Sequence, residues 1–102
     1  MSRSLSLLID VAGASAVVAL VNKDQQVIAQ IRLTFDRRLG TSLLTAIDSL
    51  MRQEKIALEK LRKIVVSRSG VEQHMAVRTC LVIAGILAYA AHLDLEDISS
   101  AS

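Results

Sequence analysis

Asp10 and Gly13 are the first residues whose types could support chemistry. Asp10 follows the apolar run Leu7-Leu8-Ile9, and Gly13 comes three residues later. A carboxylate at the end of a strand can hold a metal ion, and a nearby glycine can let the backbone turn around a phosphate. The chain contains no glycine-rich loop elsewhere, and a polar residue at a strand end is ordinary. Nucleotide binding therefore depends on Asp10 and Gly13 alone, and the sequence predicts no cofactor.

His74, Cys80 and His92 are the other residues of chemically active types. Their separations of six and twelve residues do not bring three side chains to one ion, because metal ligands on one helix are three or four residues apart. The single cysteine cannot form an intramolecular disulfide, and within an apolar run it behaves as a small core residue. The sequence thus predicts no metal site and no catalytic activity.

The composition predicts one domain over residues 1–102, with a core of Leu, Ile, Val and Ala. Twelve Lys and Arg are scattered among ten Asp and Glu, and Phe35 and Tyr89 are the only aromatic residues. Nucleic-acid binders usually concentrate basic charge and offer aromatic stacking platforms, so we expect no direct nucleic-acid binding. Asp10 interrupts the apolar N-terminal run too early for a secretory signal. We expect a cytoplasmic protein that does not contact the membrane.

Three strands are predicted first, because short apolar and β-branched runs alternate with turn residues. They cover Leu5 to Ile9, Ala16 to Val21, and a third run after the turn at residues 22–25 in which Val27, Ala29, Ile31 and Leu33 form one apolar face. The three strands should form an antiparallel meander, with the third strand at the edge of the sheet.

Two helices and two more strands should follow. Thr41 or Ser42 can cap a helix whose apolar stripe consists of Leu43, Leu44, Ile47, Leu50 and Met51. Leu58 and Leu61 belong to a connecting turn before a strand at Ile64, and a second helix runs from Met75 to Ala91. The segment from Leu93 to Ile98 alternates acidic and apolar residues, as an exposed edge strand does. This pattern suggests that the chain is naturally short and was not cut from a longer one.

The second helix is apolar on both sides. Its run from Leu81 to Ala91 is shorter than the ~20 residues that span a bilayer, so we expect a buried helix. Val77, Cys80 and Ala84 fall on one side of the helical wheel, and bulkier residues fall on the other. One side can pack on the sheet, which leaves the other for a partner chain. The predicted interface consists of Val82, Ile83, Gly85, Ile86, Tyr89 and Ala90.

The element order β-β-β-α-β-α-β predicts an α/β fold with a mixed sheet. The first three strands pair antiparallel, and each strand-helix-strand crossover requires parallel pairing. Such a sheet with helices packed on it is a ribonuclease H-like, actin-like half-domain. In that fold a carboxylate at the end of the first strand contributes to the phosphate site, which is the position of Asp10.

The chain resembles the N-terminal half of TsaB, also called YeaZ, the actin-like scaffold protein of bacterial tRNA threonylcarbamoyladenosine synthesis. Leu8-Ile9-Asp10 is similar to the family's first strand, and residues 15–20 are similar to its second. Residues 43–50 resemble its first helix, L-L-P-x-I-D-x-L. Gly70 and Arg78 stand where its G-P-G-S-F-T-G-L-R motif begins and ends.

The chain also departs from the family. Residues 71–77 replace the interior of the signature motif, and no hydroxyl residue directly follows Asp10. The family's C-terminal half, which completes the two-lobed cleft, is absent from the sequence. A shared fold does not transfer a function, so the inherited role is an open expectation.

The resemblance implies a non-catalytic scaffold that uses its two helices for pairing. TsaB-like proteins use these helices to pair with themselves or with the catalytic subunit TsaD. We therefore expect a homodimer or a complex with a TsaD-like subunit in tRNA modification. One alternative is a self-associating domain without a role in tRNA modification, and another is a reduced ATP-binding protein that uses Asp10 and Gly13.

Overall fold

The computed structural model describes residues 5–12, 15–34, 38–69 and 74–99. Within them the order of strands and helices is the predicted one, with an additional 3-10 turn, η1, before the fourth strand. The elements are β1 (Ser6–Ala12), β2 (Ser15–Val21), β3 (Val27–Thr34), α1 (Leu39–Gln53), η1 (Leu58–Lys60), β4 (Lys63–Ser69), α2 (His74–Ala91) and β5 (Asp94–Ser99).

The five strands form one mixed sheet in the order β3-β2-β1-β4-β5. β1 pairs antiparallel with β2, and β2 pairs antiparallel with β3. β4 pairs parallel with β1 and with β5, as the two crossovers through α1 and α2 require. The predicted ribonuclease H-like arrangement is therefore confirmed, and β3 and β5 lie at the two edges.

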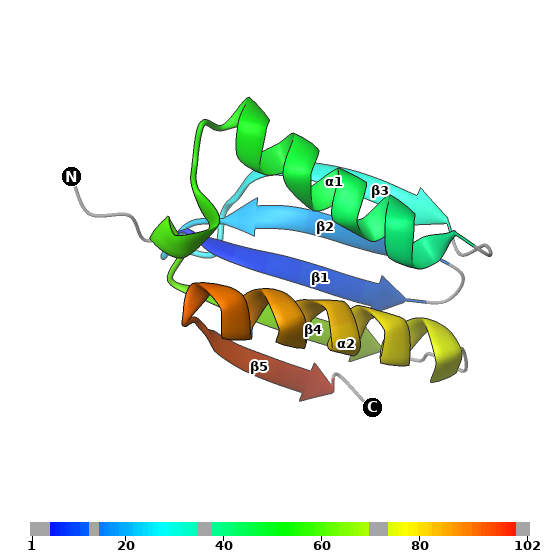
Figure 1. The fold of residues 1–102 in the computed structure, drawn as a ribbon. Helices are drawn as coiled ribbons and strands as arrows, with labels where there is room; N and C mark the ends of the chain where they lie inside the picture. Colours follow the sequence, from blue (N-terminus) through cyan, green and yellow to red (C-terminus); the bar gives the residue numbers. More distant parts are fainter. Residues whose placement is uncertain (1–4, 13–14, 35–37, 70–73, 100–102) are drawn as a thin grey trace.

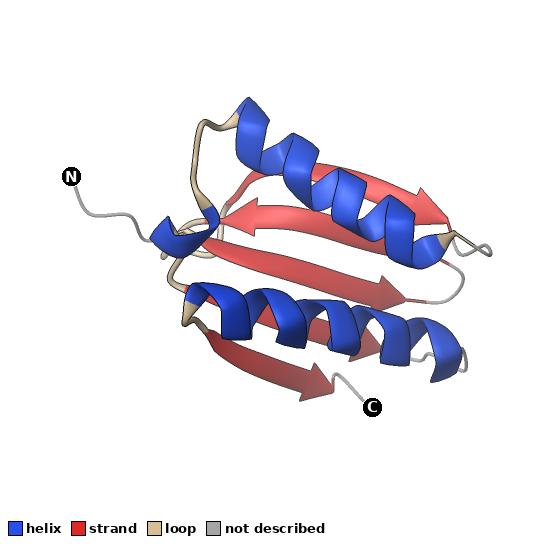
Figure 2. Ribbon diagram, in the orientation of Figure 1, coloured by secondary structure: helices blue, strands red, loops and turns tan. Residues whose placement is uncertain are grey.

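Both helices lie on the same side of the sheet and run in the same direction (Figures 1 and 2). The core lies between this helical layer and the sheet. Successive side chains of a strand point to opposite faces, and in β1 the fully buried residues are Leu7, Ile9 and Val11. Opposite them, α1 buries Leu43 and Leu50, and α2 buries Cys80 and Ala84.

The first helix begins earlier than the sequence predicted. α1 starts at Leu39, and Arg38 stands before it without a side-chain capping hydrogen bond. The predicted caps Thr41 and Ser42 lie inside the first turn, where the Ser42 amide donates to the Arg38 carbonyl over 2.8 Å. The burial of Leu39 in the core accounts for the early start, because packing outweighs the modest gain of a cap.

The edge strand β5 has the predicted exposure, and its acidic residues pair with β4. Lys63 Nζ lies 3.1 Å from Glu96 Oε1, and an Arg68 guanidinium nitrogen lies 3.3 Å from Asp97 Oδ2. Leu95, which precedes Glu96, and Ile98, which follows Asp97, remain partly exposed. Charges on an edge strand discourage pairing with another sheet edge, so β5 is protected where it meets solvent.

Candidate interaction surface

The outward side of α2 carries three large apolar side chains that nothing in the described chain covers. Val82, Ile86 and Tyr89 are 58%, 62% and 86% exposed. Their spacing of four and three residues places them on one stripe of the helix. The opposite stripe, with Val77, Cys80, Ala84 and Ala88, is buried against the sheet. Exposed apolar side chains in a contiguous group mark interaction sites in soluble proteins.

A groove lies beside this stripe, where α1 and α2 end. Its volume is about 750 Å³, within the range of pockets that hold ligands or side chains. Its apolar lining consists of Leu44, Ile47, Met51, Ile56, Ala57, Leu58 and Leu87, and its polar lining of Asp48, Arg52, Lys55 and Glu59. Arg52 Nε and Asp48 Oδ2 form an ion pair of 3.1 Å on α1. The groove is thus an apolar hollow with charged groups around it.

The groove depends on how the two helices end. The Ile56 amide donates to the Met51 carbonyl, and the Lys55 amide donates to the Arg52 carbonyl. Lys55 has a φ of 55°, so α1 closes in a Schellman motif with a left-handed residue at its end. The chain then turns back through η1, which brings Leu58 to one side of the hollow and Leu87 of α2 to another.

The outward stripe of α2 (Val82, Ile86 and Tyr89), Leu44 of α1 and this groove together form one surface. We call this surface the two-helix face. Leu44 is 46% exposed on α1. Leu44 is the one member of the predicted apolar stripe that is not buried, because it lies at the border of that stripe while Leu43, Ile47, Leu50 and Met51 face the core. The sequence did not predict the groove, since residues 44–59 meet Leu87 only through the packing of the two helices.

The six residues of the predicted interface do not share one direction. Val82, Ile86, Tyr89 and Ala90 are exposed. Ile83 is half-buried, and its Cδ1 atom approaches Gly40 of α1. A Cβ atom on Gly85 would lie 4.0 Å from Leu95 of β5, so this glycine faces a side chain of its own chain. Val82, Ile86 and Tyr89 therefore offer the largest apolar surface of the six.

The other side of the sheet carries no helix among the described residues. A smaller hollow of about 280 Å³ lies there, between β2, β1, β4 and β5. Leu8, Val65 and Ile98 contribute apolar lining, and the Lys63–Glu96 pair lies at the same hollow. Val65 is already buried within the chain. This surface is more polar than the two-helix face and exposes fewer large apolar side chains.

Asp10 does not stand at the end of its strand, as the sequence predicted. β1 continues to Ala12, and Asp10 is flanked by Val17 of β2 and Ser67 of β4. The backbone pairing of Val11 and Ala12 with both neighbouring strands accounts for the longer strand. Its side chain is half-buried and lies on the sheet face opposite the helices. Gly13, the other nucleotide candidate, lies outside the described residues.

Cys80 is a core residue, as predicted. Its side chain is fully buried, and this burial raises the pKa of the Cys80 thiol to about 11, because the thiolate is poorly solvated there. Such a thiol is inert at neutral pH. His92 is exposed beyond α2, and nothing is described for the His74 side chain. Within the described residues, no three His, Cys, Asp or Glu side chains are close enough to hold a metal ion.

In the described part of the chain, neither helix has the length and apolarity that crossing a bilayer requires.

No protein-family model and no curated protein matches the sequence. Among solved structures, YeaZ from Pseudomonas aeruginosa is similar with a TM-score of 0.79 and 22% identity, over 95% of this chain and 44% of that one. A second structure, described as a protein with similarity to peptidase YeaZ from the same organism, gives a TM-score of 0.76 and 19% identity over the same shares. RuvC of Thermus thermophilus with a Holliday junction substrate gives 0.60 and 9%, over 95% of this chain and 65% of that one.

These similarities confirm the predicted resemblance at the level of the fold. The chain spans less than half the length of the two YeaZ-like structures, and identities this low carry the architecture and not the activity. The sheet order, the two crossovers and the two helices on one side are those of the predicted ribonuclease H-like, actin-like half-domain. The two YeaZ-like structures share this architecture over nearly the whole of this chain.

Proposed function

We propose that this chain is a non-catalytic interaction module that pairs through its two-helix face. The observation that carries the proposal is the exposed apolar stripe of Val82, Ile86 and Tyr89 beside an apolar groove. Interface centres are depleted of charge and enriched in aromatic and aliphatic side chains. The same helical layer packs on the sheet with its other side, so pairing would leave the fold unchanged.

The partner is either a second copy of the chain or a TsaD-like, actin-like subunit of the tRNA threonylcarbamoyladenosine pathway. The similarity of the fold to YeaZ supports this direction, together with the helices that TsaB-like proteins use for pairing. The chain contributes a surface and no reacting group to this assembly.

The first experiment measures molar mass by light scattering on a size-exclusion column. Wild type should be a dimer at high micromolar concentration, and Ile86→Glu should be a folded monomer, because a carboxylate buried in an apolar interface is costly. Ile98→Glu is the matched control, since Ile98 is 44% exposed on the opposite side of the sheet. Circular dichroism checks that both variants fold.

The control also tests the alternative surface. A dimer that persists in Ile86→Glu and dissociates in Ile98→Glu would move the interface to the open side of the sheet and overturn the proposal. Purification of a tagged copy from its native host separates the two partners. Recovery of a TsaD-like subunit with wild type and its loss with Ile86→Glu supports the tRNA-modification role, whereas recovery of the chain alone supports a self-associating domain.

A further inference from the structure

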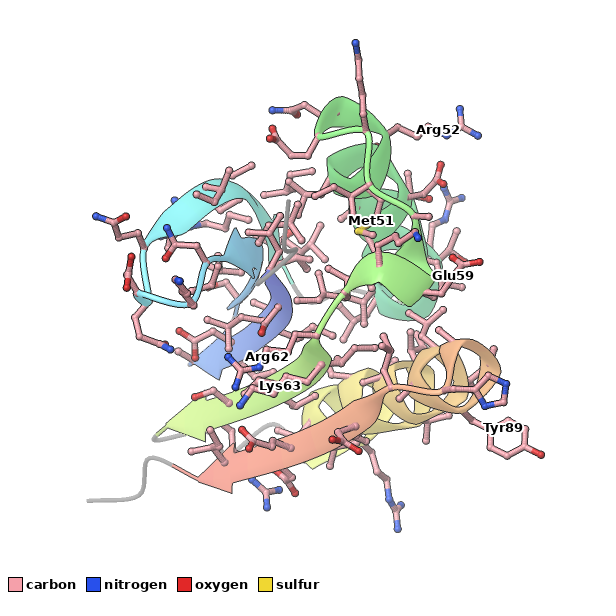
Figure 3. The ribbon with its side chains drawn as sticks, turned by 90° about the vertical axis from the view of Figure 1, so that its left-hand side faces the viewer. Met51, Arg52, Glu59, Arg62, Lys63 and Tyr89 are labelled. Carbon is pink, nitrogen blue, oxygen red and sulfur yellow. The ribbon has the colours of Figure 1, made fainter. Side chains whose placement is uncertain are left out.

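The side of the sheet opposite the helices carries an ordered grid of side chains. Figure 3 views the sheet roughly along its strands, with α1 and α2 to the right of the sheet and the Lys63 side chain extending toward the other side. The strand registers arrange the residues of this other side, the open face, in rows that cross the sheet. One row contains Gln30, Ala19, Leu8, Val65 and Glu96, and the next contains Arg32, Val17, Asp10, Ser67 and Ile98.

The strands β1 and β4, which pair parallel in the middle of the sheet, are apolar on both faces. Residues 7–9 of β1 and 64–66 of β4 are continuous apolar runs, and Leu8 and Val65 are the members that lie on the open face. Such runs are typical of parallel strands that are covered on both sides. In β3 polar residues alternate with apolar ones, as in a strand with one solvated face. The pattern therefore favours a covering layer over β1 and β4, and none over β3.

Asp10 lies in the middle of the open face and is half-buried. No side-chain hydrogen bond or ion pair joins its carboxylate to another described residue. Arg32 stands in the same row, but Val17 of β2 lies between them, and strands ~4.8 Å apart separate the two backbones by about 10 Å. A carboxylate that a covering layer removes from water is costly unless the layer supplies a cation. A layer over β1 must therefore bring Lys or Arg to Asp10.

The dimensions of this area fit one α-helix. A helix is about 10 Å wide, a little over two strand spacings, so it covers β1 and β4 and leaves the edges open. The seven residues of β1 span roughly 23 Å, which is the length of a helix of about 15 residues. The hollow of about 280 Å³ on this face, with Leu8, Val65 and Ile98 in its lining, offers a socket for one apolar side chain of such a helix.

We infer that the open face binds an amphipathic helix of a partner protein, which places a Lys or Arg against Asp10 and apolar side chains on Leu8, Val65 and Ile98. The Lys63–Glu96 ion pair lies at the border of this contact, where interfaces are polar and solvated. The open face and the two-helix face lie on opposite sides of the chain and share no residue. A chain occupied on both sides bridges two proteins, which extends the proposed function to a second partner.

A peptide-display selection tests the inference with a defined probe. The library presents helical peptides of about 18 residues, long enough to span β1. Their apolar stripe of Leu and Ile is fixed, and one position at its centre is varied among all residue types. Selection on wild type should enrich Lys and Arg at this position, and selection on Asp10→Lys should enrich Asp and Glu instead. Asp48→Lys, on the two-helix face, is the matched control and should keep the wild-type preference.

The selection overturns the inference if wild type enriches no basic residue, or if Asp10→Lys selects the same residues as wild type. Circular dichroism checks that each variant is folded. Asp10→Asn, which keeps the shape of the side chain, provides the same test with a milder change. It should weaken binding of a selected peptide at least about tenfold in fluorescence anisotropy, because the peptide's cation is then left unpaired.

Variants of the two faces separate this inference from the proposed function. Ile98→Glu should also weaken the peptide at least about tenfold, whereas Ile86→Glu should leave its affinity within about twofold. A peptide that Ile86→Glu releases and Asp10→Asn retains binds the two-helix face, which overturns the inference and leaves the proposed function standing. Peptide binding that depends on Asp10, in a chain that neither self-associates nor binds a partner through Ile86, supports the inference while the proposed function fails.

Discussion

Ile83 of α2 packs over Gly40 of α1, so this side chain lies against α1 at a position where α1 has no side chain. A Cβ atom added to Gly40 would lie 3.6 Å from Ile83 Cδ1 and 3.8 Å from Thr79 Cγ2. Both distances are ordinary van der Waals contacts, so the space admits one methyl group. The contact fixes α2 beside the first turn of α1 and thereby leaves the opposite ends of the helices to form the groove.

Gly40→Ala should therefore stabilise the protein. The added methyl group fits without displacing Ile83, and alanine in a helix is favoured over glycine by about 0.5–1 kcal/mol. Urea denaturation should show a higher midpoint with an unchanged slope. Gly40→Leu is the matched control and should destabilise the protein, because its larger side chain cannot share the space with Ile83. A lower midpoint for Gly40→Ala would contradict the described packing.

Lys55 and His92 end the two helices in the same way. His92 has a φ of 59°, and the Leu93 amide donates to the Ala88 carbonyl, as Ile56 does to Met51 at the end of α1. Residues with a side chain adopt this left-handed conformation at a cost that glycine does not bear. His92→Gly should raise the free energy of unfolding by about 0.5–1 kcal/mol. Ser49→Gly, in the exposed middle of α1, should lower it by a similar amount.

Leu43 and Leu44 are neighbours in α1, but one lies in the core and the other at the surface. Leu43 is fully buried and Leu44 is 46% exposed. Leu43→Ala should lower the free energy of unfolding by about 2–5 kcal/mol, whereas Leu44→Ala should change it by less than about 0.5 kcal/mol. If the two-helix face mediates pairing, Leu44→Ala should instead weaken self-association in light scattering. A large loss of stability in Leu44→Ala would place this side chain in the core after all.

The sequence predicts the elements and their order well, because hydrophobic periodicity is a local signal. In β3, Ala29, Ile31 and Leu33 are partly buried while Gln30 and Arg32 are exposed, as the alternation predicted. Val27 departs from the pattern, since a register shift between Leu20 and Val21 of β2 disturbs the pairing there. The alternation of polar and apolar residues in β3 and of acidic and apolar residues in β5 also predicted that these two strands lie at the edges of the sheet, as they do.

The surface is predicted less well, because its parts are distant in the sequence. The stripe of Val82, Ile86 and Tyr89 could be read from helical periodicity alone. The groove could not, since it requires the end of α1, the turn of η1 and Leu87 to meet in space. Ile83 and Gly85 show the same limit: their neighbours, Gly40 and Leu95, belong to other elements.

Cys80 should make stability depend on pH in the alkaline range. Its thiol has an ordinary pKa of 9.0, and burial raises the pKa to about 11 in the folded protein. Between pH 9 and 11 the unfolded chain loses this proton while the folded protein keeps it, so unfolding is favoured as the pH rises. The contribution of this group to the free energy of unfolding is fully present below pH 9 and falls by up to about 1.4 kcal/mol per pH unit above it.

Cys80→Ala isolates this effect, because every other ionisable group is the same in both proteins. Urea midpoints are measured at pH 7.5, 9.0 and 10.5. At pH 7.5 wild type should be the more stable, because alanine leaves a small cavity in the core. Its advantage should shrink by pH 10.5, where only wild type has a thiol to ionise on unfolding. An advantage that stays constant across the three pH values would mean that Cys80 is as well solvated in the fold as in the unfolded chain, which contradicts its position between α2 and the sheet.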